Sequence, residues 1–106
     1  MKADLHNHSY YSDGVLSPAE VVRLACQAEC DLFSLTDHDT TDGIEEAQLE
    51  ANKLNLNLIN GVEISASWRN MAIHILGLGI DINNDILQAG LEHNQKLRKE
   101  RAEKIA

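Results

Sequence analysis

The chain has 106 residues, of which 43% are hydrophobic and 25% are charged, the balance of one small globular domain. Its formal net charge is −8, with 17 acidic residues against 9 basic ones. This surplus of carboxylates excludes the general basic surface that holds nucleic-acid phosphates, so binding to duplex DNA is not expected. It is compatible with bound divalent cations, which neutralise carboxylates that would otherwise repel one another.

Strand and helix signals alternate over the first sixty residues. Ser17-Pro18-Ala19-Glu20 predicts a capping box at the start of the first helix, with Ser17 as the N-cap and Pro18 at the first helical position. The expected elements are a strand over 3–7, a helix over 18–29, a strand over 31–36, a helix over 42–54 and a strand over 56–60. This alternation is typical of an α/β fold with parallel strands.

The following segment predicts an antiparallel pair. Gly61 is expected to break the preceding strand, and two longer strands are predicted over 62–68 and 72–80. Arg69-Asn70 lies between them and favours a turn.

A last helix is predicted over 84–106, and it has no terminating signal, because Ile105 and Ala106 still fit its apolar stripe. A parallel sheet covered on both faces needs more strands than this chain supplies. We therefore expect a truncated, N-terminal portion of a longer domain. Its uncovered apolar surface is expected to promote self-association.

Two cysteines, Cys26 and Cys30, lie four residues apart at the end of a predicted helix. Neighbouring turns of one helix rarely allow disulfide geometry, so we interpret both as small buried apolar residues rather than a disulfide or metal ligands. No secretory signal is evident, and no apolar run approaches the ~18 residues that a membrane span needs. These features predict a cytoplasmic protein.

Residues that can bind metal recur near the expected strand ends. They are His6, His8, Asp13, His38, Glu63 and His74. In an extended chain His6 and His8 project to the same side, and α/β folds gather their ligands at strand ends. Each residue alone has an ordinary explanation: a hydrogen-bonded structural histidine, a turn aspartate before Gly14, or a solvated glutamate. Their recurrence together favours one common site, whereas His93, on the last helix, is expected at the surface.

The ligand set combines imidazole and carboxylate without thiolate, which favours Zn²⁺, Mn²⁺ or Fe²⁺ over a cysteine-rich structural zinc. Six candidates exceed what one tetrahedral ion uses, so more than one ion is expected. Ions about 3.5–4 Å apart can activate a water and stabilise an in-line displacement at phosphorus.

Four ordered blocks contain these residues, and together they resemble the PHP (polymerase and histidinol phosphatase) family of metal-dependent phosphoesterases. The blocks are DLHNHS (4–9) with SDG (12–14), LTDHDT (35–40), GVEIS (61–65) and HILGLG (74–79). The resemblance implies the N-terminal part of a distorted (β/α)₇ TIM-like barrel, truncated here, with residues 1–106 as the N-terminal portion of the PHP domain.

The resemblance also implies up to three divalent metals at the C-terminal ends of the strands. In this implied arrangement His6 and His8 bind one metal, Glu63 bridges, and His74 binds the second. Asp13 and His38 serve a third, and all six residues are catalytic. The family's later Asp-x-His pair has no match in this chain.

Within the family, the similarity is greatest to stand-alone hydrolases that act on small phosphorylated nucleotides and short RNA, as nucleotide phosphatases or exoribonucleases. Arg98 and Arg101, three apart in the last predicted helix, resemble arginines that contact a second phosphate of the nucleotide. Their ordinary explanation is a solvated charged face.

Two other functions stay open at this point. One is a non-catalytic module that metal stabilises, and the other is an amidohydrolase-type enzyme that cleaves C–N bonds. The latter expects a metal-bridging lysine, and Lys53, inside a predicted helix, is poorly placed for that role.

Overall fold

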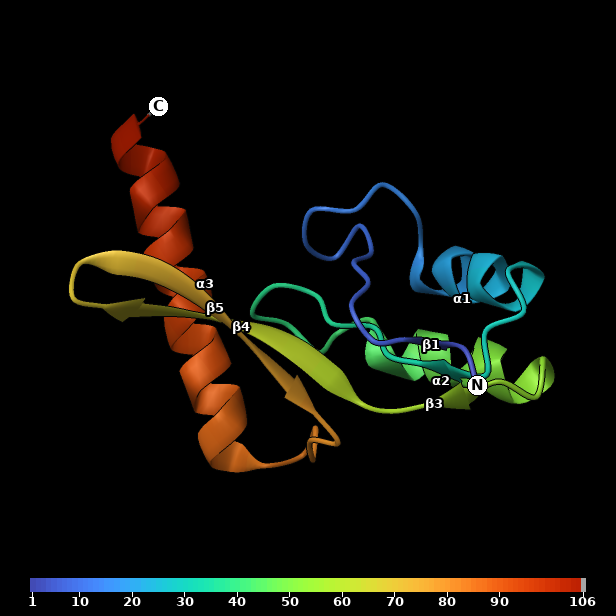
Figure 1. Ribbon diagram of the computed structural model, residues 1–106. Helices are drawn as coiled ribbons and strands as arrows, with labels where there is room; N and C mark the ends of the chain where they lie inside the picture. Colours follow the sequence, from blue (N-terminus) through green and yellow to red (C-terminus); the bar gives the residue numbers. More distant parts are fainter. Residues whose placement is uncertain (106) are drawn as a thin grey trace.

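The computed structural model describes residues 1–105, arranged as five strands and three helices (Figure 1). In chain order they are β1 (Ala3–Asp4), α1 (Pro18–Gln27), β2 (Leu32–Phe33), α2 (Ile44–Lys53), β3 (Asn57–Leu58), β4 (Gly61–Trp68), β5 (Met71–Leu78) and α3 (Asp85–Ile105). The predicted order of strands and helices is confirmed. The expected continuation of the last helix to Ala106 lies outside the described residues.

Strands β1, β2 and β3 form a parallel sheet in that spatial order, and α1 and α2 connect them in turn. Each strand is only two residues long, shorter than predicted. The ladder beside β1 is interrupted by Asn7, whose Nδ2 donates to the carbonyl oxygens of Asp4 (3.2 Å) and Ser34 (3.1 Å). Pairing resumes where the Thr36 amide donates to the Asn7 carbonyl at 2.7 Å. Hydrogen bonds from the Asn7 side chain therefore replace part of the backbone ladder, between the candidate ligands His6 and His8.

Both helices of this region end in the same way. The residue after each C-cap is left-handed, with φ of 60° at Glu29 and 56° at Asn55. The next amides then donate back into the helix, from Cys30 to the Ala25 carbonyl (3.0 Å) and from Leu56 to the Ala51 carbonyl (2.9 Å). This is the Schellman arrangement, which reverses the chain toward the following strand. It ends α1 two residues earlier than predicted, while the predicted capping box at Ser17 is confirmed.

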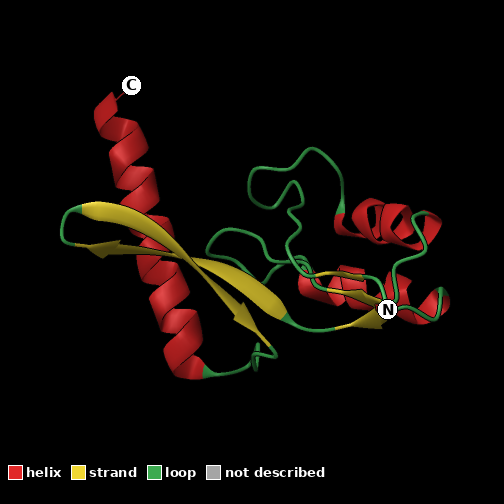
Figure 2. Cartoon of the chain, in the orientation of Figure 1, coloured by secondary structure: helices red, strands yellow, loops and turns green. Residues whose placement is uncertain are grey.

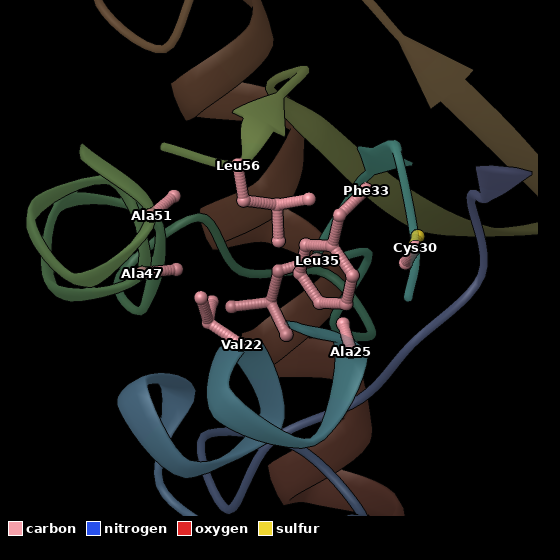
Figure 3. Packing of buried hydrophobic residues seen from close by; sticks show 8 residues of the cluster. All are labelled: Val22, Ala25, Cys30, Phe33, Leu35, Ala47, Ala51 and Leu56. Carbon is pink, nitrogen blue, oxygen red and sulfur yellow. The ribbon is translucent and has the colours of Figure 1, made fainter. Parts of the chain in front are cut away.

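The core lies between the sheet and these two helices (Figure 3). Its cluster consists of Val22, Ala25, Cys30, Phe33, Leu35, Ala47, Ala51 and Leu56. Phe33 and Leu35 are two apart, so they share the sheet face on which α1 and α2 pack. Both cysteines are free thiols. Cys30 is buried in the core, as predicted, whereas Cys26 is only partly buried against it.

Strands β4 and β5 form an antiparallel hairpin in which Trp68 pairs with Met71 (Figure 2). Its turn residues have positive φ, 50° at Arg69 and 64° at Asn70, as a type I′ turn requires, and the predicted turn is confirmed. The expected break between the third and fourth strands is present but lies at residues 59–60, and Gly61 itself is the first residue of β4. A Cβ there would lie 2.4 Å from Ser34 Oγ, so only glycine allows β4 to pass so close to the segment after β2.

The hairpin joins the sheet through a parallel bridge between His38 and Glu63. Helix α3 crosses the hairpin and buries Leu91, which is 2% exposed (Figure 1). Apolar side chains elsewhere on the hairpin, such as Trp68 and Met71, are more than half exposed. The expected self-association through such a surface stays a prediction. Among the described residues, no helix combines the length and apolar character that crossing a bilayer requires.

Candidate metal centre

The six predicted ligands converge on one site, and the carboxylate of Glu63 lies at its centre. Glu63 Oε2 is 2.9 Å from His6 Nε2 and 2.8 Å from His8 Nε2. Its other oxygen, Oε1, lies 3.2 Å from His74 Nδ1. Glu63 itself is only 5% exposed, whereas the side chains of His6 and His74 are more than half exposed. One oxygen of this buried carboxylate thus faces His6 and His8, and the other faces His74.

Asp13 closes the opposite side of the site. Its two oxygens lie 2.6 Å from His8 Nδ1 and 3.0 Å from His38 Nε2. The rings of His8 and His38 are stacked at a tilt, with centroids 4.3 Å apart. His8 therefore lies between two carboxylates, Asp13 at one ring nitrogen and Glu63 at the other.

Three overlapping groups have ligand atoms close enough for one ion each. They are His6–His8–Glu63, His8–Asp13–His38 and His38–Glu63–His74. His8, His38 and Glu63 each belong to two groups, so ions bound there would share ligands. Glu63 belongs to two groups, which is the geometry expected of a residue that bridges two ions.

A buried nitrogen without a hydrogen-bond partner tests whether a metal ion fits this site. His38 Nδ1 is buried and has no hydrogen-bond partner among the described residues, and its nearest acidic oxygen, Glu63 Oε2, is 3.7 Å away. A buried polar atom without a partner costs about 1–3 kcal/mol. Because this nitrogen points toward Glu63 within the third group, a divalent ion would satisfy it. The nitrogen and oxygen donors suit Zn²⁺, Mn²⁺ or Fe²⁺.

The protein keeps both central carboxylates ionised. Burial alone would raise the pKa of Glu63, but hydrogen bonds with His6 and His8 and the nearby charge of His38 outweigh it and lower the pKa below the ordinary value. Burial would also raise the pKa of Asp13, but the charges and hydrogen bonds of His8 and His38 outweigh it. The pKa of Asp13 is therefore lowered as well. Ionised oxygens are the form that binds metal.

The loop that contains His8 and Asp13 folds back tightly at Gly14. Its amide donates to the Ser9 carbonyl at 2.9 Å, and a Cβ at Gly14 would lie 2.6 Å from the His8 carbonyl oxygen. Only glycine permits this approach, which brings Asp13 over His8.

Beside His74, the hairpin and α3 enclose a cavity of about 540 Å³ lined by both predicted substrate arginines, Arg98 and Arg101. The two arginines differ in their contacts. Arg98 donates to Asp39 Oδ2 (2.7 Å) and to Ser65 Oγ (2.8 Å), so its guanidinium also anchors α3. Arg101 is exposed at the same cavity. In the sequence the two arginines look alike, because nothing there shows that Asp39 lies beside Arg98.

The two residues set apart from the ligand set, His93 and Lys53, belong to none of its groups. His93 is exposed, as predicted, and lines the cavity near the arginines. Lys53 is exposed in the last turn of α2, before the N-terminal end of β3, whereas the ligands gather at the opposite ends of the strands. A metal-bridging role for Lys53 is therefore inconsistent with the fold.

Comparison with known proteins gives a family match over nearly the whole chain. The model of the PHP domain family matches residues 4–103. The chain is 45% identical over 104 residues to a 5′-3′ exoribonuclease of Haemophilus influenzae, covering 98% of this chain and 38% of that protein. It is also 45% identical over 102 residues to a 3′,5′-nucleoside bisphosphate phosphatase of Chromobacterium violaceum, covering 96% of this chain and 36% of that protein. The chain thus spans little more than a third of the length of these relatives.

Solved structures agree with this match. An amidohydrolase from Chromobacterium violaceum, with bound sulfate and no metal, superposes with a TM-score of 0.94 at 44% identity, covering 98% of this chain and 37% of that one. A proposed metal-dependent phosphoesterase from Bifidobacterium adolescentis superposes with a TM-score of 0.91 at 28% identity, covering 96% and 36%.

Proposed function

Because this chain belongs to the PHP domain family, we propose that it forms the metal site of a phosphoesterase that hydrolyses phosphate esters of small nucleotides or short RNA. We also propose that it corresponds to the N-terminal portion of a distorted (β/α)₇ barrel. The second proposal is supported by relatives that match nearly all of this chain and are much longer.

One observation supports the metal site above all others. The three ligand groups share His8, His38 and Glu63, and the buried Nδ1 of His38 has no other partner among the described residues. Isolated structural histidines would each have a complete set of hydrogen bonds. A cluster of four imidazoles around two ionised carboxylates is better explained by divalent ions.

In this proposal His6, His8 and Glu63 would hold one ion, and His74 and Glu63 would hold a second beside the buried Nδ1 of His38. Asp13 and His38, through its Nε2, would hold a third. Bound divalent ions would supply an activated water and stabilise charge on the phosphate. Glu63 keeps His6, His8 and His74 oriented through the contacts already described, and its ionised state offsets part of the cationic charge.

The substrate class rests on the cavity and on the relatives. The relatives are named as an exoribonuclease and a nucleoside bisphosphate phosphatase, whose substrates contain several phosphates. The cavity opens beside His74 and places Arg98 and Arg101 on its wall, which gives an acidic protein a local cationic surface for an anion. A phosphate at the ligand cluster and a second one near Arg101 would match a nucleotide with two separated phosphates.

A cytoplasmic location is also part of the proposal. Its support is the pair of free thiols at Cys26 and Cys30, which a reducing compartment preserves.

Metal content is the first test. Elemental analysis of the purified chain is expected to find Zn, Mn or Fe, and His8→Ala or Glu63→Gln is expected to reduce it sharply, because each removes a ligand shared by two groups. His93→Ala is the matched control, since His93 is an exposed histidine outside every group. Equal metal content in all four proteins would contradict the proposal.

Turnover then distinguishes the competing functions. A metal-dependent phosphoesterase releases phosphate from a nucleotide bisphosphate or a short RNA and leaves amide substrates intact. Retained metal without hydrolysis of any phosphate ester would favour the non-catalytic module. Cleavage of C–N bonds instead would favour the amidohydrolase-type alternative.

A further inference from the structure

Asp37 precedes His38 in the chain, yet its side chain belongs to none of the three ligand groups. It is only 2% exposed, and both of its oxygens accept hydrogen bonds from the loop that follows β1. Oδ1 accepts from the Ser9 amide and from Ser12 Oγ, and Oδ2 accepts from Ser9 Oγ, each at 2.6 Å. Three short bonds engage both oxygens of this buried carboxylate, and they direct it toward the loop after β1 rather than toward the ligand groups.

The loop that Asp37 contacts has few other anchors. Tyr10 and Tyr11 are 55% and 45% exposed, and the side chain of Asp13 is 60% exposed. Ser9 is the exception, being completely buried. The Ser9 carbonyl in turn accepts from the amides of Ser12 (3.1 Å) and Gly14 (2.9 Å), the residues on either side of Asp13. The path from Asp37 through Ser9 to Asp13 thus consists of hydrogen bonds rather than apolar packing.

Asp39, on the other side of His38, provides a natural comparison. It is 1% exposed and also accepts three hydrogen bonds, from the Ser65 amide, Asn94 Nδ2 and Arg98. All three donors belong to β4 or α3, and none belongs to the loop after β1. The two aspartates are therefore matched in burial and bonding but anchor opposite sides of the site.

We propose that Asp37 is a positioning residue that fixes the 9–14 loop, so that Asp13 stays in contact with His8 and His38. Its consequence for metal binding rests on the proposed function. Without Asp37, Ser9 loses its attachment to the segment that contains His38, and the turn that the Ser12 and Gly14 amides make with the Ser9 carbonyl opens more often. The His8–Asp13–His38 group then loses its carboxylate more often than the other two groups do.

Asp37→Asn tests this with Asp39→Asn as the matched control. Asparagine preserves shape but replaces one acceptor oxygen with an NH₂ donor, which faces the Ser9 and Ser12 donors. Amide hydrogen exchange in the metal-free chain is the primary measurement. Asp37→Asn is expected to speed exchange at Ser12 and Gly14 about tenfold, the scale of one lost hydrogen bond to a charged group. Asp39→Asn is expected to speed exchange at Ser65 and leave Ser12 and Gly14 unchanged.

Ser12→Ala covers the case in which Asp37→Asn does not fold. It removes one of the three bonds from the loop side and should speed exchange at Gly14 by a smaller factor. Unchanged exchange at Ser12 and Gly14 in Asp37→Asn, or equal acceleration there by Asp39→Asn, would overturn the proposal. If Asp37→Asn unfolds, unchanged exchange in Ser12→Ala would overturn it as well.

Zn²⁺ titration provides the second measurement. Asp37→Asn is expected to weaken binding of the ion at the Asp13 group about 10- to 100-fold, the range for residues that orient ligands, and to resemble Asp13→Ala. Asp39→Asn is expected to keep that affinity. If exchange changes as expected but neither Asp37→Asn nor Asp13→Ala affects Zn²⁺, the loop-positioning role stands and the metal assignment of that group fails.

Discussion

The N-terminal half (residues 1–58) and the C-terminal half (residues 61–105) are stabilised differently. In the N-terminal half, Val22, Phe33 and Ala47 are completely buried between the sheet and two helices. In the C-terminal half, Trp68 and Ile75 are at least half exposed, and α3 is attached largely through polar bonds such as those to Asp39. Apolar packing therefore dominates one half, and directed hydrogen bonds dominate the attachment of the other.

The ligand cluster joins these unlike halves. Its N-terminal members, His6, His8, Asp13 and His38, come from segments beside a packed core, while Glu63 and His74 come from the hairpin. The candidate ligands on the hairpin therefore depend on a few specific contacts at the junction between the halves. Core substitutions should therefore affect stability most, junction substitutions should affect both stability and the site, and cavity substitutions should affect substrate binding most.

The largest effect is expected from the core. Phe33→Ala removes a fully buried aromatic side chain and should lower the free energy of unfolding by about 3–5 kcal/mol. Ile75→Ala, on the hairpin at 50% exposure, should lower it by less than about 1 kcal/mol. Urea denaturation of the two variants measures the difference. Similar losses would show that the halves are packed alike.

The junction should give an intermediate effect. Gly61→Ala places a Cβ 2.4 Å from Ser34 Oγ and 2.8 Å from Thr36 Cγ2, which should cost about 1–3 kcal/mol of unfolding free energy. Gly90→Ala is the control in α3, where a Cβ meets nothing within 4 Å, and should stabilise by about 0.5–1 kcal/mol. Thermal unfolding measures both changes. A neutral Gly61→Ala would mean that β4 can move away from β2 freely.

The smallest effect is expected at the cavity and concerns substrate rather than fold. If the proposed function holds, Arg101→Ala should raise KM about tenfold for a nucleotide with two separated phosphates, because it would remove the proposed charged hydrogen bond to the second phosphate. It should leave hydrolysis of a simple aryl phosphate almost unchanged. Arg98→Ala should impair both substrates, since Arg98 also ties α3 to Asp39. Steady-state kinetics with both substrates checks this, and equal losses in Arg101→Ala would make Arg101 an ordinary surface residue.

The sequence alone determined the features that depend on near neighbours in the chain. The capping box at Ser17 and the turn at Arg69-Asn70 are formed by residues at most three apart, and both were predicted correctly. The ordered blocks around His6, His38, Glu63 and His74 predict a ligand set from residue types at short spacing, and the structure brings these residues together.

Only the tertiary structure decided how those residues meet. Three such contacts join residues 28 to 59 positions apart: the bond between Ser9 and Asp37, the contact of His8 with Glu63, and the pairing of Arg98 with Asp39. The requirement for glycine at position 61 has the same origin, since it comes from Ser34 and Thr36 on a neighbouring segment. Local propensity is determined within a few residues, whereas a hydrogen bond between distant segments exists only after the fold has brought its donor and acceptor within about 3 Å.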